Sequence, residues 1–402
     1  MRSPTLTWHL IPLQYNTMEL DLNIIKDLGD FNKRVLIHTP VELINSVEKT
    51  LKSVEYSFSR RKSQKRWFSQ EIFTFIITVH DVNPNYYIEC VQSVLNQTYK
   101  KIEVIIVEHG TNKEITDYNI RLLLEDDRVK ILRILENKMD NFFGLINAAI
   151  FFSIGEYFYF IAHDDKVSNN YAEKMMELFL SNSNCNTAAP LPISINKDGD
   201  ENTLTSEIFR MRNSRNQFTN GVDLVSSFIN NENKICMPGG IFAHRTINVL
   251  KHGGIDTEND VSQIFKFAIY GESGFDSSAI LYWRHHDLQT NRLLTKQGFL
   301  KYKLQINYFL DLSEVIKINV GSKIAEDILE YGQNYARNNL VGVIVRLIES
   351  KNFTALALYC ARMVKEVPIF IIIFSIFESI LKILIKVFNK VVRRLKGLIK
   401  HV

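Results

Sequence analysis

The chain has 402 residues, of which 46% are hydrophobic, and a formal net charge of +4. This composition excludes a disordered chain and is enough to bury the core of one large domain with extensions, or of two domains. The four cysteines show no CxxC or metal-ligand spacing, which excludes a disulfide framework and is typical of reduced core cysteines in a cytosolic protein.

The amino-terminal region, residues 1–70, is predicted to be a small extension. Its first 16 residues lack a long apolar core followed by a small-residue cleavage site, so export is not expected. Two strand-like pieces, 6–12 and 33–40, come first, and a helical stretch then leads into the basic run 59–67.

Strands and helices alternate from residue 73 onward. Continuous apolar runs of strand length, rich in β-branched residues, favour strands buried on both faces. These predicted strands are 73–79, 102–107, 129–134 and 157–162. Apolar residues at helical spacing predict a helix around 88–95, and further helices are predicted at 114–125 and 142–153. This order predicts an α/β fold with a mostly parallel sheet.

Polar residues follow three of these strands where each strand ends. They are His80-Asp81, Glu108-His109-Gly110 and His163-Asp164-Asp165. The carboxyl ends of parallel strands meet at one edge of the sheet, where α/β proteins bind ligands. We therefore expect the three signatures to converge.

Asp164 and Asp165 are adjacent like charges at the end of a buried strand, and they repel unless a cation neutralises them. Mg²⁺ and Mn²⁺ prefer oxygen ligands and are often held by one or two carboxylates plus substrate phosphates. The alternative is that Asp164 caps the next helix and Asp165 is a solvated turn residue.

Two longer segments carry a family resemblance. They are FIITVHDVNPNYYIECVQSVLNQTYKKIEVIIVEHGT (75–111) and GLINAAIFFSIGEYFYFIAHDD (144–165). Together they resemble the inverting glycosyltransferases of family 2, over roughly residues 72–290. The resemblance implies a GT-A fold, a Rossmann-like mostly parallel sheet flanked by helices, over 71–298. The sequence pattern itself predicts a helical region at 299–366 and an amphipathic basic helix at 367–402.

The resemblance also implies roles for individual residues. Asp164, helped by His286, would hold the Mn²⁺ or Mg²⁺ ion. Glu108 would hydrogen-bond the nucleotide base, although it could also be a solvated strand end. The positions implied to bind the nucleotide-sugar donor are Thr78, Val79, His80, Glu108, Asn147, His163, Asp165 and Arg284.

A general base is needed to take the proton of the acceptor hydroxyl. The segment 252–267 offers Asp260 and Glu258, and we favour Asp260 because an apolar helix follows it directly. Asp256 remains a candidate, and Asp260 could instead be a helix N-cap.

Several residues depart from the family pattern. Ala162 stands where the first Asp of the metal motif is usual, and His109 replaces a common Asp. Asp81 stands where Asn is usual, and Ile146 where Arg is frequent. These departures leave donor preference open and make a catalytically degenerate relative conceivable.

The carboxyl-terminal segment 367–402 is basic and amphipathic. Seven bases and no acid lie within 382–400, and subtracting them from +4 leaves −3 for the rest of the chain. Such a helix is predicted to lie on an anionic membrane surface rather than to bind nucleic acid or span the bilayer. The alternative is a helix that packs on the catalytic domain.

The sequence therefore predicts a metal-dependent inverting glycosyltransferase at the inner face of the cell membrane. It would transfer a sugar to a saccharide or lipid-linked saccharide in surface polysaccharide synthesis, and a membrane-bound scaffold is the alternative. A glycoside hydrolase is disfavoured because its carboxylates face each other across the sugar, about 5–9.5 Å apart. A nucleotidyltransferase is disfavoured because GxGxxG and GxxxxGK[ST] are lacking.

Overall fold

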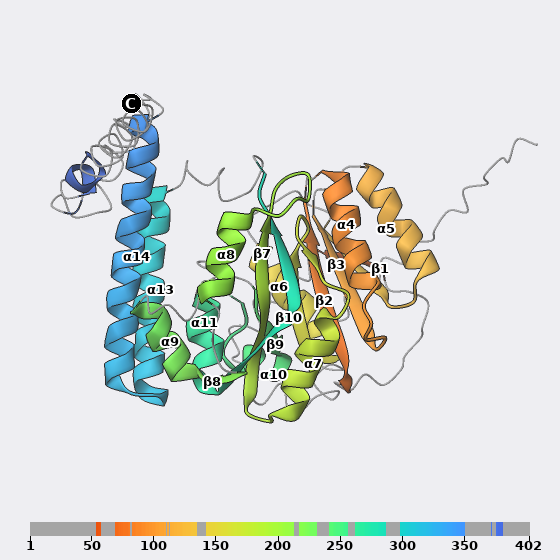
Figure 1. Ribbon diagram of the computed structural model, residues 1–402, viewed down its shortest axis with the longest axis horizontal. Helices are drawn as coiled ribbons and strands as arrows, with labels where there is room; N and C mark the ends of the chain where they lie inside the picture. Colours follow the sequence, from red (N-terminus) through yellow and green to blue (C-terminus); the bar gives the residue numbers. More distant parts are fainter. Residues whose placement is uncertain are drawn as a thin grey trace, which may run out of the picture. The chain divides into compact units, whose positions relative to one another are not determined.

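The structure is a computed structural model (Figure 1). It describes residues 54–57, 69–80, 83–109, 111, 113–134, 142–212, 217–230, 241–255, 262–286, 298–349, 371 and 375–380. The chain divides into two compact units, residues 1–172 with 245–255, and residues 173–244 with 256–402.

The first unit holds the elements that the sequence predicts most clearly. They are β1 (Val54–Ser57), β2 (Ser69–Val79), α4 (Pro84–Leu95), β3 (Ile102–His109), α5 (Lys113–Glu125), β4 (Val129–Ile134), α6 (Phe142–Phe152), β5 (Gly155–Ala162), β6 (Lys166–Val167) and α10 (Thr246–Lys251). The alternation predicted between residues 73 and 162 is confirmed, although β2 begins four residues earlier than expected.

The sheet of the first unit has the strand order β1-β4-β3-β2-β5. Strands β4, β3, β2 and β5 are parallel, as predicted, and only β1 is antiparallel to its neighbour. Right-handed crossovers place α4 and α5 on one face of this sheet and α6 on the other (Figure 1). Strands β3 and β4 therefore lie on one side of β2, and β5 lies on the other side. Folds of this kind bind ligands at such a switch point in strand order.

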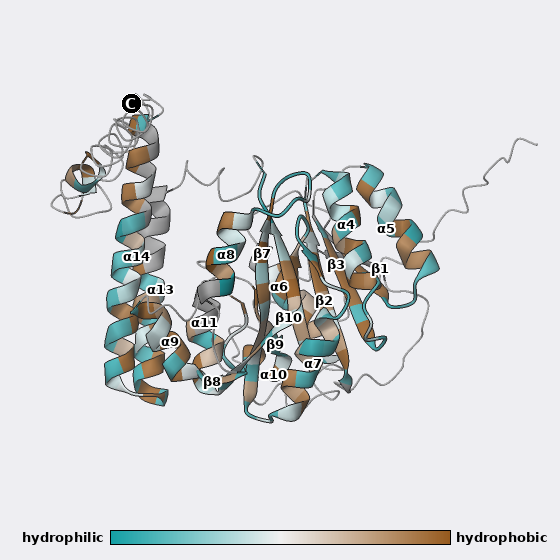
Figure 2. Cartoon of the chain, in the orientation of Figure 1, coloured by the Kyte–Doolittle hydropathy of each residue, from teal (hydrophilic) through white to brown (hydrophobic). Residues whose placement is uncertain are grey.

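The central strands are buried on both faces. In β2, Phe73, Phe75, Ile76 and Ile77 have no exposed surface, and the apolar side chains of β3 are almost as inaccessible. Figure 2 shows β2 hydrophobic along most of its length, whereas α5 carries hydrophobic and hydrophilic residues in alternation. This burial explains why continuous apolar runs, rather than alternating ones, encode these strands.

Strand β1 corrects one expectation from the sequence. We expected the stretch before the basic run 59–67 to be helical, but Val54–Ser57 is a strand that pairs with β4. The exposed ladder of an edge strand is a template for pairing, and Val and Tyr suit a strand. The tertiary contact therefore outweighs the local helical pattern.

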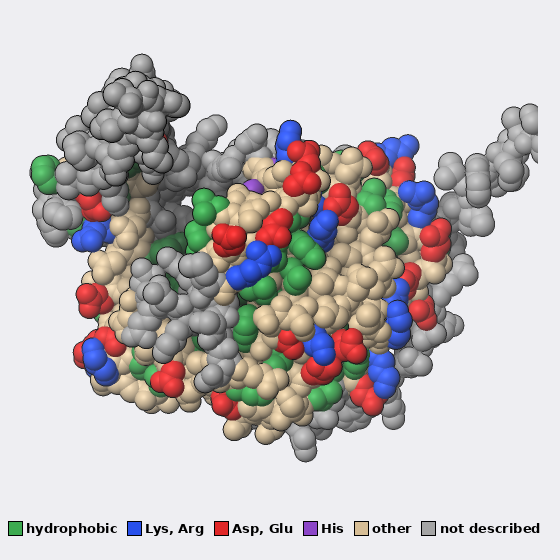
Figure 3. Space-filling view, viewed as in Figure 1, with side chains coloured by type: hydrophobic (Ala, Val, Ile, Leu, Met, Phe, Trp, Pro, Cys, Tyr) green, Lys and Arg blue, Asp and Glu red, His purple; other side chains and the backbone are tan. Residues whose placement is uncertain are grey.

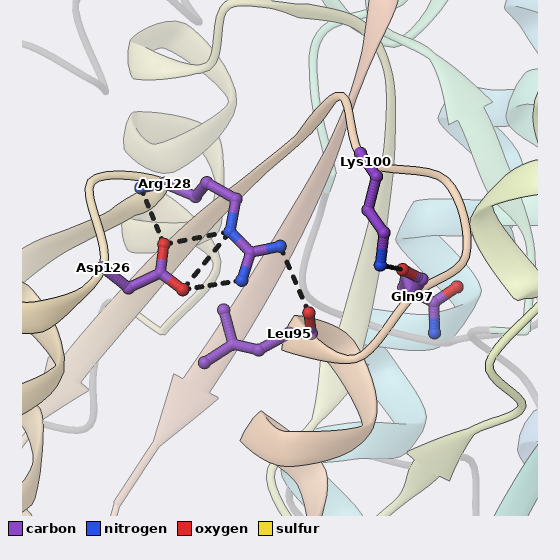
Figure 4. Close-up of polar contacts among 5 residues, drawn as sticks. All are labelled: Leu95, Gln97, Lys100, Asp126 and Arg128. Atoms are coloured by element: carbon purple, nitrogen blue, oxygen red, sulfur yellow. Dashed lines mark hydrogen bonds and ion pairs between the residues drawn. The ribbon is translucent and has the colours of Figure 1, made fainter.

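Helix α4 is fixed at both ends. The side chain of Asn83 accepts a hydrogen bond from the backbone N–H of Asn85, and Pro84 occupies the first turn. At the other end, Arg128 donates to the carbonyl of Leu95 while it pairs with Asp126 in a two-pronged contact (Figure 4). The last turn of α4 is thereby joined to the start of β4.

Strand β5 begins at Gly155, where the chain packs tightly against β2. A Cβ atom at this position would lie 2.5 Å from Oγ1 of Thr74 and 2.6 Å from the carbonyl oxygen of Ile72. The backbone N–H of Gly155 donates to the same Thr74 hydroxyl. Only glycine allows β5 to come this close to β2.

The second unit contains further strands and a long helical hairpin. Its elements are α7 (Tyr171–Ser181), which begins at the end of the first unit, β7 (Cys185–Ile195), α8 (Thr203–Arg212), β8 (Phe218–Asn220), α9 (Gly221–Ile229), β9 (Ala243–Arg245), α11 (Ser262–Phe267), η2 (Ala268–Tyr270), β10 (Glu272–Arg284), α13 (Gly298–Asn319) and α14 (Ser322–Glu349). Strand β10 pairs in parallel with β7 and antiparallel with β8, and β9 pairs antiparallel with β7.

The helices α13 and α14 confirm the prediction of helix beyond residue 299 as far as residue 349. They pack together, and α14 also contacts α9. The aromatic rings of Phe228, Phe265, Phe309 and Tyr331 form one cluster with centroids 5.2–6.2 Å apart. Edge-on aromatic packing of this kind stabilises the contact of α9 and α11 with α13 and α14.

Only a short part of the predicted amphipathic helix is described. Within 375–380, Ser379 is buried and donates to the carbonyl of Val341 on α14, whereas Phe377 and Ile380 are exposed. No helix among the described residues has the length and apolar character needed to cross a bilayer. The rest of the amphipathic segment lies outside the described residues.

Cys90 and Cys185 are buried and neither forms a disulfide, as the sequence predicts for reduced core cysteines. Cys236 and Cys360 lie outside the described residues.

Candidate functional site

Three strands of the first unit end at the same level. In the strand register, Thr78 lies opposite Val107 of β3 and Ala162 of β5, and Val79 lies opposite Glu108. Thr78, Val79, His80, Glu108 and the turn after Ala162 therefore share one edge of the sheet. The predicted convergence is found for these residues, while Asp81 and Gly110 lie outside the described residues.

The turn that carries the two acids is tight. The backbone N–H of Asp165 donates to the carbonyl of Ala162 at 3.1 Å. Nδ1 of His163 lies 3.0 Å from the carbonyl oxygen of Thr78. A carbonyl oxygen only accepts, so Nδ1 carries the hydrogen and the imidazole ties the turn to the end of β2.

The two adjacent acids lie in different surroundings. Asp164 is half-buried, whereas Asp165 is only 8% exposed. Burial raises the pKa of Tyr159, and the charge of Asp165 raises it further. Asp164 is therefore the more accessible carboxylate for a cation, and the donor contact of Asp165 remains a prediction.

Gln97, the glutamine of the SVLNQTY motif, supports the segment that follows the two acids. Its Nε2 donates to the carbonyl of Ser168 at 2.8 Å, and its Oε1 accepts from the N–H of Ala172 at 2.8 Å. The N–H of Thr98 also donates to the carbonyl of Asn169 at 2.7 Å. The family resemblance implied no role for Gln97, and the structure shows one.

Glu108 is 3% exposed and accepts hydrogen bonds from neighbouring side chains. The hydroxyls of Thr111 and Thr116 both donate to its Oε1 at 2.6 Å. The amide of Asn119 donates to Oε2 at 3.4 Å. Glu108 is therefore not a solvated strand end, which was the alternative reading of the sequence.

Asn147 has a different partner from the one the sequence suggested. On α6, its Nδ2 donates to the carbonyl of Ile255, and its Oδ1 accepts from the N–H of Ile255, both at 2.8 Å. The side chain is 5% exposed. The amide of Asn147 holds the backbone of Ile255, and its donor-binding role remains a prediction.

The remaining predicted residues belong to the second unit. Arg284, at the end of β10, is 1% exposed and donates to the carbonyl of Lys197 at 3.2 Å. His286 is half-buried two residues further on. Asp256, Glu258 and Asp260 lie outside the described residues, so the general base remains a prediction.

The carboxylates of Asp164 and Asp165 are of the ligand type that hard cations such as Mg²⁺ and Mn²⁺ prefer. Within the described residues, no group of three or more His, Cys, Asp or Glu side chains forms a metal site. A magnesium-type ion that is shared with substrate phosphates needs only one or two protein carboxylates. The accessible carboxylate of Asp164 fits that requirement.

Comparisons with known proteins agree with this geometry. Residues 74–233 match the family described as glycosyl transferase family 2. Over 107 residues the chain is 29% identical to glycosyltransferase GlyG of Streptococcus pneumoniae serotype 4, a match over 27% of this chain. The chain spans about a third, 35%, of the length of that curated relative.

A solved structure shows the same fold. The crystal structure of S. aureus TarS 1–349 in complex with UDP-GlcNAc matches with a TM-score of 0.52 and 11% identity, covering 74% of this chain and 82% of that one. The mostly parallel α/β sheet flanked by helices is therefore the GT-A fold that the sequence predicted.

Proposed function

Residues 74–233 match glycosyl transferase family 2, and on that premise we propose that the chain transfers a sugar from a nucleotide-diphosphate sugar to a hydroxyl of a saccharide or lipid-linked saccharide. The observation that carries this proposal is the acidic turn after β5. It presents Asp164 at the switch point of a parallel sheet, beside the ends of β2 and β3.

The proposed reaction is a single displacement with inversion at the anomeric carbon. Asp260, or Glu258 in its place, accepts the proton of the acceptor hydroxyl as that oxygen attacks. Asp164, with His286 as the second predicted ligand, would hold Mn²⁺ or Mg²⁺. Such an ion offsets the negative charge that grows on the leaving diphosphate.

The turn itself has an orienting role in this scheme. The contact of His163 with the carbonyl of Thr78 and the bonds of Gln97 to residues 168 and 172 fix the backbone on both sides of Asp164. A carboxylate that is held in place costs little reorganisation when charge develops nearby. We propose that these contacts set the position of Asp164 before the donor binds.

A nucleotide sugar is the donor class that the comparisons favour, because the similar TarS structure contains UDP-GlcNAc. In this chain, Glu108 at the end of β3 is proposed to meet the base. Arg284 is proposed to meet the diphosphate.

We also propose that the protein works on the inner face of the cell membrane, in surface polysaccharide synthesis. The exposed Phe377 and Ile380 lie in the segment predicted to be amphipathic. In the same segment, the hydroxyl of Ser379 donates to the carbonyl of Val341 on α14. Apolar side chains next to a run of bases suit an anionic lipid surface. Nucleic acid is not an expected partner, because the face opposite the bases of the predicted amphipathic helix is strongly apolar and would have to be wetted by solvent. On the face of the molecule shown in Figure 3, the described basic and acidic side chains are interspersed.

Asp164→Asn tests the proposal. The full chain would be incubated with a panel of UDP- and GDP-sugars, with Mn²⁺ or with EDTA, and nucleotide release would be measured. We expect metal-dependent release by the wild type and a loss of about 10²–10³-fold in the variant, the range found for removing one transition-state contact. Asp198→Asn, an exposed turn acid, is the matched control and should release nucleotide at the wild-type rate.

Full turnover by Asp164→Asn, or turnover that EDTA does not change, would contradict the assignment of Asp164. If the wild type released nucleotide from no donor but still bound anionic vesicles, the scaffold function would replace the enzymatic one. The substitution of Ala162 for the usual first acid is the observation that favours this second candidate.

A further inference from the structure

Helix α4 and the residues just after it hold the chain around the two adjacent acids. We call residues 162–172, which contain Asp164 and Asp165, the acidic segment. Cys90 and Ser93 lie on α4, three positions apart, and Gln97 follows the last turn of the helix. Positions three or four apart lie on the same side of a helix, so these side chains can contact one segment of chain.

The first contact lies at the start of the acidic segment. The thiol of Cys90 donates to the carbonyl of Ala162, with the sulfur 3.5 Å from the oxygen. The N–H of Asp165 donates to the same carbonyl at 3.1 Å. The turn that carries the two acids is therefore attached to α4 where it begins.

The hydroxyl of Ser93 makes the second contact. It donates to the carbonyl of Cys90 at 2.7 Å, and it accepts from the N–H of Val167 at 3.2 Å. A hydroxyl has one hydrogen, so an oxygen that donates to its own helix can only accept from elsewhere. Ser93 is thereby oriented to receive the backbone N–H that lies two residues after Asp165.

Gln97 continues this contact along the segment. Its Nε2 donates to the carbonyl of Ser93 as well as to that of Ser168, both at 2.8 Å, while Oε1 accepts from Ala172. The side chain has no exposed surface. Because both hydrogens of the amide are used within the fold, Gln97 fixes the end of α4 and the acidic segment together.

All of these contacts reach backbone atoms of the acidic segment. They fix the course of the chain on both sides of Asp164 without using a carboxylate oxygen of either acid. A carboxylate on a backbone that is already held loses less conformational freedom when it binds an ion. The helix can therefore influence a cation that it does not touch.

We propose that Ser93 is a positioning residue of the proposed transferase. Its hydroxyl holds the backbone after Asp165, and so sets how readily Asp164 binds a divalent cation together with the donor diphosphate. This inference rests on the proposed function, and it deepens it by naming a residue outside the predicted site that controls the affinity for the cation. Loss of this hydrogen bond should weaken cation binding in a chain that remains folded.

Ser153 supplies a matched control. Its hydroxyl donates to the carbonyl of Ile150 at 2.7 Å, which is the same bond to the third preceding residue that Ser93 makes. Ser153 lies just before β5, at the opposite end of that strand from the acidic segment. Ser153→Ala and Ser93→Ala therefore remove the same bond to a helix, and Ser93→Ala also removes the contact with Val167.

The first measurement is hydrogen exchange at the amide of Val167 in the full chain. We expect this amide to be protected in the wild type and to exchange about threefold or more faster in Ser93→Ala. Ser93→Thr keeps the hydroxyl and should restore most of the protection, whereas Ser153→Ala should leave it unchanged. A Val167 amide that exchanges in the wild type as fast as an unprotected one would overturn the inference without any variant.

The second measurement is the affinity for UDP and GDP, by calorimetry over a series of Mn²⁺ concentrations. We expect the Mn²⁺ concentration that gives half of the increase in nucleotide affinity to rise about 3- to 10-fold in Ser93→Ala, the effect of one neutral hydrogen bond. Ser93→Thr should restore the wild-type requirement, and Ser153→Ala should keep it. Nucleotide affinity without Mn²⁺ should be the same in all four proteins.

The outcomes separate the inference from the proposed function. An unchanged Mn²⁺ requirement in Ser93→Ala, or an equal rise in Ser153→Ala, would overturn the positioning role and leave the proposed function intact. A wild type whose affinity for both nucleotides does not respond to Mn²⁺ would overturn the cation assignment in the proposed function, and the role of Ser93 with it.

Discussion

Strand β3 carries a buried glutamate near each end, and the two ends differ in the partners they offer. Glu103, at the amino edge of the sheet, forms an ion pair with Lys130 and accepts from the N–H of Ile154 as well as from Thr74. Glu108, at the carboxyl edge, accepts from the neutral side chains of Thr111, Thr116 and Asn119.

The difference lies in how each carboxylate is held. Glu103 meets a countercharge and joins β2, β4 and the turn before β5, so its charge is neutralised within the fold. Glu108 is oriented by the hydroxyl groups of Thr111 and Thr116 and by the amide of Asn119. Burial alone does not distinguish the two residues, because both are 3% exposed.

The largest expected effect is the loss of stability when the ion pair between Glu103 and Lys130, at the amino edge of the sheet, is removed. Glu103→Ala leaves Lys130 largely buried without its carboxylate, which should lower the free energy of unfolding by about 3–5 kcal/mol. Urea denaturation measures this change. The control is Glu71→Ala, which breaks the exposed pair with Lys101 and should cost at most about 1 kcal/mol. Similar costs for the two variants would mean that the amino edge is not held by this pair.

At the carboxyl edge, substitution of Glu108 is expected to change the free energy of unfolding less than Glu103→Ala does. It is expected to change nucleotide affinity more. Glu108→Gln keeps the shape of the side chain and removes the charge, so UDP or GDP affinity should fall about 10- to 100-fold, as for a hydrogen bond to a charged group. Calorimetric titration of the folded variant measures this. Nucleotide affinity at the wild-type level would make Glu108 a structural acid like Glu103.

The smallest effect is a pH dependence at the amino edge. The hydrogen bond from Arg128 holds the pKa of Asp126 below its ordinary value of 3.8, so the pair stabilises the fold above that pH. The contribution is lost as the pH falls through the lowered pKa of the folded state. Asp126→Asn should cost up to about 1 kcal/mol at pH 7.

Urea unfolding of wild type and Asp126→Asn at pH 7 and near pH 2 measures this dependence. The gap between the two proteins should close at the acidic end. A gap that stays constant between the two pH values would show that the charge of Asp126 is not what stabilises the pair.

The sequence predicted most of the first unit because its strands are buried on both faces and its helices are periodic. The convergence of Thr78, Val79, His80 and Glu108 followed from parallel strand order alone. Strand β1 could not be found in this way, because Val54–Ser57 becomes a strand only through its pairing with β4.

The side-chain contacts of the site were harder to predict because they join distant residues. Asn147 and Ile255 are 108 positions apart, and Gln97 and Ser168 are 71 apart. The sequence did contain one signal for the contact between Asn119 and Glu108. Asn119 follows Ile115 by four residues and shares its buried face of α5, and a polar residue at a core position needs a partner.

The clamp between Asn147 and Ile255 has a consequence for which substitutions the chain can accept. Both hydrogen bonds go to backbone atoms of residue 255, so the clamp places no polar demand on the side chain there. Position 147 has no such freedom, because aspartate cannot donate and leucine can neither donate nor accept. In related chains we expect the apolar residue at 255 to vary in shape while the asparagine persists.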